Sequence, residues 1–210
     1  MADVNSFTLS VIDTATNTVV ATIPFVLGEI PIQVAITPDG ARSYVTSFTN
    51  PGTVSVIDTA TNTVLESIPV SPKPEGVAIT PDGTRAYVPG EGFIPFPGTL
   101  VSVVDTATNT VIGSIPVGRY PDGIAIASDG TRGYVTNGLD NTVTVIDITT
   151  NTAVATIPVG RFPEWVAIVP GPKAPKSKEG CKHGAYLKFG PPVGPFKNQG
   201  QCVRYVEHHH

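Results

Sequence analysis

The sequence has few of the residues on which catalysis and metal binding most often depend. Of its four histidines only His183 lies outside the terminal run, and there are just two cysteines. A catalytic triad needs a base beside its nucleophile, most often a histidine, and a structural zinc site uses four Cys or His ligands. No phosphate-binding loop or dinucleotide fingerprint is present. We therefore expect no enzyme activity, no metal ion and no cofactor.

Long apolar runs and a basic excess are also missing. No run reaches the roughly 20 residues of a membrane span, and residues 1–5 show no secretory signal. Residues 1–170 hold 6 Lys and Arg against 15 Asp and Glu, a net charge of −9, which argues against a nucleic-acid partner because phosphate contacts need a basic face. Residues 171–210 hold 7 against 2, a net charge of +5. This tail is either a solvated segment or docks on an anionic surface, the acidic body included.

Glycine and proline, by contrast, are abundant, at 21 each. Both stop helices, while the many Val and Thr residues favour strands. The motif Val-Ile-Asp-Thr-Ala-Thr-Asn-Thr at 11–18 returns with small changes at 56–63, 103–110 and 145–152, so its aspartates are 45, 47 and 42 residues apart. These intervals predict a tandem of four-stranded units.

The third interval shows the unit most plainly. We expect its strands at 123–127, 132–136, 142–147 and 153–157, with the first two joined by Asp129-Gly130. Asp-Gly between apolar runs is a strong hairpin signal because glycine accepts a positive φ. In each unit the segment equivalent to 58–63 joins the third and fourth strands, where Asp and Asn suit a tight turn. A calcium loop is the alternative, although the alternating acidic pattern of such loops is missing.

Apolar side chains fall on both faces of the third strand, with Val54 and Val56 on one face and Ile57 on the other. A sheet that is apolar on both faces is covered on both sides, and radially stacked blades give that cover. We therefore predict an all-β fold, a β-propeller with four blades of four antiparallel strands in a closed or partly open ring, over residues 1–170. Residues 171–210 form a separate tail rich in Pro, Gly and Lys.

The repeat resembles the YVTN β-propeller family. The matching elements are Pro121-Asp-Gly-Ile-Ala-Ile126, Asp129-Gly-Thr-Arg132, Tyr134-Val-Thr-Asn137 and Val145-Ile-Asp147. The tetrad is complete only at 134–137 and degrades at 44–47 and 87–90. The resemblance covers about residues 6–170 and implies the fold rather than one activity. Similar propellers occur in surface-layer and other extracellular proteins as interaction scaffolds, and some propeller relatives are enzymes.

The tail looks like a short two-cysteine motif at the C-termini of exported bacterial proteins, carried by Cys181-Lys-His-Gly-Ala-Tyr186 and by 196–206 around Cys202. Exported context and the even cysteine count favour a Cys181–Cys202 disulfide closing a small hairpin, with 185–189 paired against 203–206. A catalytic cysteine beside His183 is the alternative. The ending 207–210 resembles a shortened affinity tag and is excluded as a metal site.

Candidate binding residues lie in segments that depart from the repeat. The connections from fourth to first strands keep a final proline but vary in sequence, and the insertion 90–98 has no counterpart in the other units. Loops carry function because they escape core packing, and arginine beside an aromatic ring suits protein or carbohydrate recognition, although each connection is also explained as a simple turn. The candidates are Arg119, Tyr120, Arg161, Phe162, Trp165, Phe93 and Phe96.

The ends of the repeat region predict how the ring closes. The chain opens with third and fourth strands at 7–23, and its last first strand is expected at 165–169, so one second strand is missing. An unfilled gap would expose backbone edges. We expect a tail strand, from 185–187 or 204–206, to fill the gap between 165–169 and 7–13. Otherwise the ring is partial and needs a partner, as in a homo-oligomer.

These observations favour a non-enzymatic scaffold that binds a protein or surface polysaccharide, extracellular or at the cell surface. The alternative is a lactonase-like propeller hydrolase completed by a metal ion or a partner chain. A third possibility is a structural fragment that becomes a ring only on oligomerisation.

Overall fold

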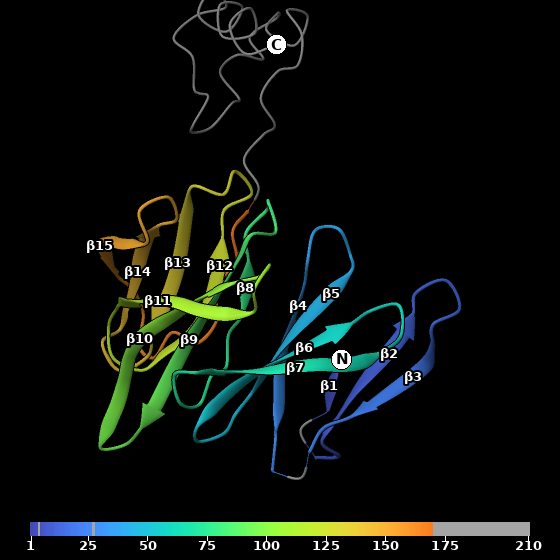
Figure 1. The fold of residues 1–210 in the computed structure, drawn as a ribbon. Coiled ribbons are helices and arrows are strands. Elements are labelled where there is room, and N and C mark those ends of the chain that lie inside the picture. The colour runs from blue at the N-terminus through green and yellow to red at the C-terminus, as the bar shows by residue number, and fades with distance from the viewer. Residues whose placement is uncertain (4, 27, 170–210) are drawn as a thin grey trace, which may run out of the picture. The chain divides into compact units, whose positions relative to one another are not determined.

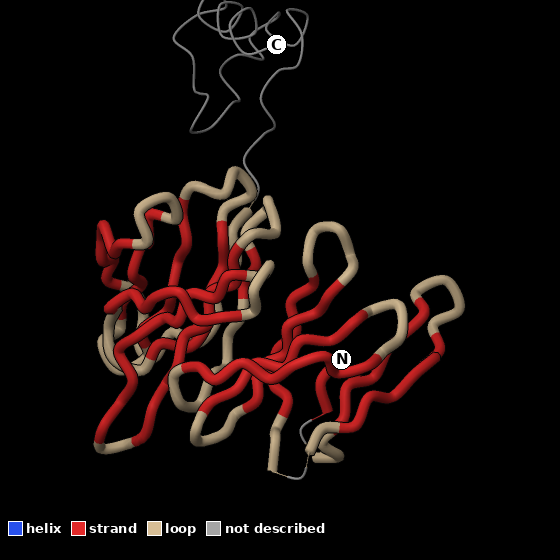
Figure 2. The backbone as a smooth tube through the Cα atoms, in the orientation of Figure 1, coloured by secondary structure: helices blue, strands red, loops and turns tan. Residues whose placement is uncertain are grey.

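The computed structural model describes residues 1–3, 5–26 and 28–169. All regular secondary structure in these residues is β-strand (Figures 1 and 2), so the described part contains no helix that could span a membrane. The strands form four antiparallel sheets, three with four strands and one with three. This is the predicted all-β propeller, in which each sheet is a blade. Residues 1–168 form one compact unit.

Each blade follows the chain order, with every strand paired to the next. The first contains β1 (Ala2–Asp3), β2 (Thr8–Asp13) and β3 (Thr18–Pro24); the second contains β4 (Pro31–Ile36), β5 (Arg42–Ser47), β6 (Gly52–Asp58) and β7 (Thr63–Val70). The third contains β8 (Ala78–Ile79), β9 (Arg85–Phe93), β10 (Phe96–Asp105) and β11 (Thr110–Pro116); the fourth contains β12 (Pro121–Ile126), β13 (Arg132–Asn137), β14 (Thr142–Asp147) and β15 (Thr152–Pro158). The four strands predicted for the third interval are confirmed to within two residues at each end.

The repeated turns have the chemistry expected of them. Asp58 Oδ1 accepts hydrogen bonds from the backbone amides of Ala60 and Thr61, at 3.0 and 2.8 Å, and Asn62 has a φ of 57°. The equivalent aspartates at 13, 105 and 147 accept the same pair of amide bonds. Each Asp-Gly hairpin likewise has its glycine at positive φ, as in Gly130 at 72°. These aspartates therefore serve the turns.

The hydrophobic core lies between successive blades rather than within one of them. Three apolar clusters fill the three interfaces, and the middle one joins Tyr44, Val54, Val56 and Ile68 of the second blade to Val77, Ala86, Val88 and Val104 of the third. Burying one such side chain contributes about 1.5–3 kcal/mol. The outer surface of the first blade has no such cover: Ile12 is 45% exposed, whereas the equivalent Ile57 is 1% exposed.

Hydrogen bonds cross the interfaces at the tyrosines of the repeated tetrad. The Tyr44 hydroxyl donates to Asn109 Oδ1 at 2.8 Å, and the Tyr87 hydroxyl donates to Asn151 Oδ1 at 2.5 Å. Both acceptors are turn residues of the following blade. The same interaction thus fixes the spacing of consecutive blades twice.

One expectation about ring closure is wrong, because residues 165–169 form no strand. The short strand β1 pairs with the start of β2 through Ala2↔Leu9 and Asp3↔Thr8. The expected tail strand at 185–187 or 204–206 lies outside the described residues. Within the described residues, no strand of the first blade has extensive contact with a strand of the fourth. The expected Cys181–Cys202 disulfide and its hairpin lie outside these residues.

Candidate cation and ligand site

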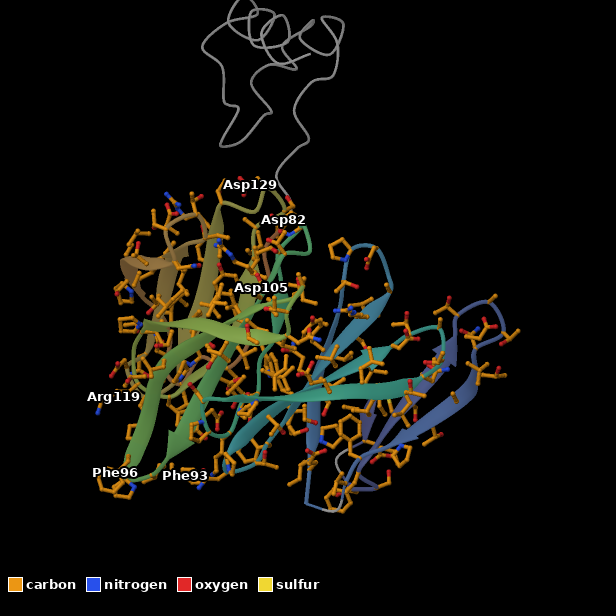
Figure 3. All side chains as sticks on the ribbon, in the orientation of Figure 1. Asp82, Phe93, Phe96, Asp105, Arg119 and Asp129 are labelled. Atoms are coloured by element: carbon orange, nitrogen blue, oxygen red, sulfur yellow. The ribbon has the colours of Figure 1, made fainter. Side chains whose placement is uncertain are left out.

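The two ends of the blades carry different types of connection between strands. One end, here the turn end, carries the regular hairpins between first and second and between third and fourth strands. The other, the loop end, carries the connections between blades and the second-to-third hairpins. Figure 3 shows Asp82 and Asp129 at the turn end and Phe93, Phe96 and Arg119 at the loop end. All seven candidate binding residues belong to loop-end segments.

Three carboxylates meet at the loop end and form the acidic centre: Glu75, Glu91 and Asp122. One oxygen of each lies within 4.8 Å of the others. Glu91 and Asp122 are only 2% and 3% exposed, and Glu75 is half-buried. They come from the connection before β8, the end of β9 and the start of β12. The cluster is therefore assembled across the interface between the third and fourth blades.

Two of these residues occupy the same repeat position, directly after the proline that ends each of these inter-blade segments. Glu75 follows Pro74, Asp122 follows Pro121, and Glu164 follows Pro163. First strands of successive blades are neighbours, and β8 contacts β12, so residues at this position face one another.

Close approach of the two backbones depends on a glycine. A Cβ atom placed on Gly76 would lie 2.5 Å from the carbonyl oxygen of Asp122, a distance that real Cβ atoms do not show. Threonines of the second strands also fix these segments: Thr46 Oγ1 donates to the Glu75 carbonyl at 2.8 Å, and Thr136 Oγ1 donates to the Glu164 carbonyl at 2.7 Å. The absence of a side chain at position 76 therefore lets Glu75 and Asp122 meet.

Glu91 reaches the centre because the β9–β10 hairpin is longer than its counterparts. The predicted insertion 90–98 continues both strands, with Phe96 opposite Phe93 and Pro97 opposite Gly92. The Glu91 amide donates to the Lys73 carbonyl at 3.1 Å, which ties this hairpin to the connection that carries Glu75. The insertion thus adds a third carboxylate to the pair from the first strands.

The acidic centre is electrostatically unfavourable. Burial, followed by the charge of Glu75, raises the pKa of Glu91 to about 7. Burial and the charges of Glu75 and Glu91 raise the pKa of Asp122 to about 8, and burial also raises the pKa of Glu75. The Tyr120 hydroxyl interacts with Glu91, and its pKa is raised by burial and by that carboxylate. Glu91 and Asp122 are therefore partly protonated near neutral pH when no cation is bound.

Two oxygens of the centre have no hydrogen-bond partner among the described residues, Glu91 Oε2 and Asp122 Oδ1. Buried polar atoms are nearly always paired, and leaving one unpaired costs about 1–3 kcal/mol. Both unpaired atoms belong to residues of the same three-carboxylate cluster.

Next to the centre lies a set of aromatic rings and one ammonium, here called the rim, which consists of Phe48, Lys73, Phe93, Tyr120 and Phe162. The Lys73 ammonium lies 4.9 Å from the centroid of Phe48 and 4.5 Å from that of Phe93, in cation–π geometry. The Tyr120 and Phe162 rings pack with centroids 5.6 Å apart. The rim therefore combines two rings from second-to-third-strand hairpins with two rings and one ammonium from the segments that follow the fourth strands.

The predicted binding residues thus divide into two groups. Tyr120, Phe162 and Phe93 belong to the rim. The others lie outside the rim and are exposed: Phe96 is 82% and Trp165 57% exposed, Arg161 is exposed, and the exposed Arg119 pairs with Asp140 at 2.7 Å. Phe162, within the rim, is also 46% exposed.

Sequence reasoning missed the acidic centre itself. The signal was a proline followed by an acidic residue at 74–75, 121–122 and 163–164. That pattern repeats with the architecture, as the turn aspartates do, so only the contact between blades distinguishes it. Glu91 lies in the insertion 90–98, where only Phe93 and Phe96 were predicted to bind a ligand.

The comparisons with known proteins support the fold. No protein-family model matches the chain, and no curated protein matches it in sequence. Among the solved structures, 1271 chains match, which indicates a widespread fold. One is titled Kuenenia stuttgartiensis hydrazine synthase, with a TM-score of 0.59 and 30% identity over 64% of this chain; the match spans 38% of that chain. Together with the four antiparallel sheets, this likeness shows that the protein has a β-propeller fold.

Proposed function

We propose that this protein is a non-enzymatic propeller scaffold of the YVTN type that binds a protein or a surface polysaccharide through its loop end. The observation that carries the proposal is the rim, where rings and one ammonium gather on segments that differ from blade to blade. Rigid aromatic side chains supply large contact area at low entropic cost, and they dominate many recognition sites. The remainder of each blade repeats and is explained by folding.

A location outside the cytoplasm belongs to the same proposal. It is supported by the likeness of the repeat to extracellular propellers and by the two-cysteine tail motif. A disulfide between Cys181 and Cys202 would persist there, because thiols stay reduced in most cytosols. The net charge of −9 over residues 1–170 disfavours nucleic acid as the ligand.

The proposal is tested by probing the full chain against a glycan array and against surface polysaccharides of bacterial cells. We expect binding that the double variant Phe96→Ser/Phe162→Ser abolishes, because it removes exposed rings at the loop end. Val154→Ser is the matched control, since Val154 is 51% exposed on the outer strand β15. Equal loss in the control variant, or ligand binding that the loop-end variant leaves intact, would place the ligand elsewhere.

A metal-assisted hydrolase is the second candidate, and one observation favours it. Glu91 and Asp122 have pKa values of about 7 and 8, which suit general acid–base catalysis near neutral pH. A panel of lactones and glycosides tests it with the full chain. Turnover that Asp122→Asn removes, while Asp129→Asn retains it, would establish the hydrolase and exclude a purely binding role.

A further inference from the structure

We infer that the acidic centre is a calcium site, in which Glu75, Glu91 and Asp122 bind one Ca²⁺ ion between the third and fourth blades. The inference is independent of the proposed function, because it depends only on the geometry and charge of these three residues. It also replaces the expectation, drawn from the scarcity of histidine and cysteine, that the chain holds no metal ion.

The spacing of the carboxylates fits calcium. Ca²⁺ binds oxygen at about 2.3–2.6 Å, so two ligands of one ion lie at most about 4.6–5.2 Å apart. The three ligand oxygens all lie within 4.8 Å of one another. Mg²⁺ demands near-ideal octahedral geometry at about 2.0–2.1 Å and resists losing water, so it suits a buried site of three carboxylates less well. An all-oxygen set also disfavours zinc, which prefers nitrogen and sulfur.

The unpaired oxygens are a second observation that favours a bound cation. Glu91 Oε2 and Asp122 Oδ1 are buried and have no partner among the described residues, although their groups lie within the cluster. A bound cation would satisfy both atoms and offset the repulsion between the carboxylates.

No positively charged side chain in the described part of the chain offsets this repulsion in place of a metal ion. Glu164 adds a further negative charge to the surroundings of Glu75 and Asp122. Lys73 is the cation whose charge acts on the centre, but its ammonium lies over Phe48 and Phe93. Three carboxylates against one displaced ammonium leave the site negative. Glu75 is only partly buried, so solvent reaches one of the three ligands.

Calorimetric titration of the EDTA-treated full chain with CaCl₂ tests the inference. We expect one ion per chain and a rise in melting temperature, with affinity weakened about 10-fold or more in Glu91→Gln, because affinity follows the charge count of the ligands. Asp129→Asn is the matched control, since it removes the same charge at the turn end. Titration with MgCl₂ is expected to show weaker binding. No binding up to ~10 mM CaCl₂, which exceeds the ~10⁻⁴–10⁻³ M of weak calcium modules, or equal binding in Glu91→Gln, would overturn the inference.

Terbium luminescence locates the ion without depending on that variant. Tb³⁺ replaces Ca²⁺ at oxygen sites and is excited by a nearby tyrosine, and Tyr120 lies beside Glu91. We expect sensitised emission that excess CaCl₂ removes and that Tyr120→Phe strongly reduces while calorimetric calcium binding persists. Emission unchanged in Tyr120→Phe would place the ion elsewhere and refute the assignment.

Discussion

Acidic residues at the two ends of the blades have opposite environments. At the turn end, backbone and hydroxyl donors of the same turn hold the pKa values of Asp58 and Asp105 below their usual range. At the loop end, burial and mutual repulsion raise the pKa values of Glu91 and Asp122. The turn-end groups are satisfied within one blade, whereas the loop-end groups come from different segments and remain unsatisfied. The turn-end carboxylates therefore stabilise the fold, whereas the loop-end carboxylates are suited to bind a cation.

The largest expected effect comes from the glycine that lets the loop-end carboxylates meet. Gly76→Val places a side chain against the Asp122 carbonyl, so we expect a loss of about 2–4 kcal/mol in the free energy of unfolding. Gly113→Ala is the control, because an added Cβ at this position meets nothing within 4 Å. Urea denaturation in EDTA measures both. A Gly76 variant as stable as the control would show that the approach of these segments is not tight.

The pH dependence of stability should separate the two ends. An acid whose folded pKa is raised loses stability as pH rises from its unfolded pKa near 4 through its folded pKa, here about 7 and 8 for Glu91 and Asp122. A lowered pKa has the opposite effect and acts only in acid, below about pH 4. In EDTA we therefore expect stability to fall by about 2 kcal/mol between pH 5 and pH 8.5. A flat profile would contradict the raised pKa values.

At the turn end, a single aspartate should matter through its hydrogen bonds. Asp105 accepts from the amides of Ala107 and Thr108 and from the Thr108 hydroxyl. Asp105→Ala removes all three, so we expect a lower free energy of unfolding at pH 7. Asp105→Asn, which keeps an acceptor oxygen, should lose less. An equal loss in both variants would mean that charge rather than hydrogen bonding stabilises the turn.

The corresponding change at the loop end should have the opposite sign. Glu91→Gln removes a buried charge that has too few partners, so in EDTA at pH 8 we expect a gain of about 1 kcal/mol. At pH 5, where Glu91 is protonated, the gain should nearly vanish. Denaturation curves measured at both pH values test this prediction. Destabilisation at pH 8 would show that the Glu91 carboxylate has stabilising partners, contrary to the structure.

Much of the fold was predictable because its signals are local and repeated. The Asp-Gly hairpins, the aspartate turns and the alternation of Val and Ile each specify a strand or a turn within a few residues. The acidic centre was not predictable in this way. Glu75, Glu91 and Asp122 are separated by up to 47 residues in sequence, and they meet only when two blades pack. The pairing of β1 with β2 was missed for a related reason. A two-residue strand has no periodic signal of its own.

Mass spectrometry of the intact chain under non-denaturing conditions tests the calcium assignment most directly. After equilibration with CaCl₂ and removal of free ion, we expect one retained calcium per chain in the wild type and in Asp129→Asn, and none in Glu91→Gln. Wild-type protein without calcium, or calcium retained equally in Glu91→Gln, would contradict the assignment of the loop-end carboxylates as a cation site.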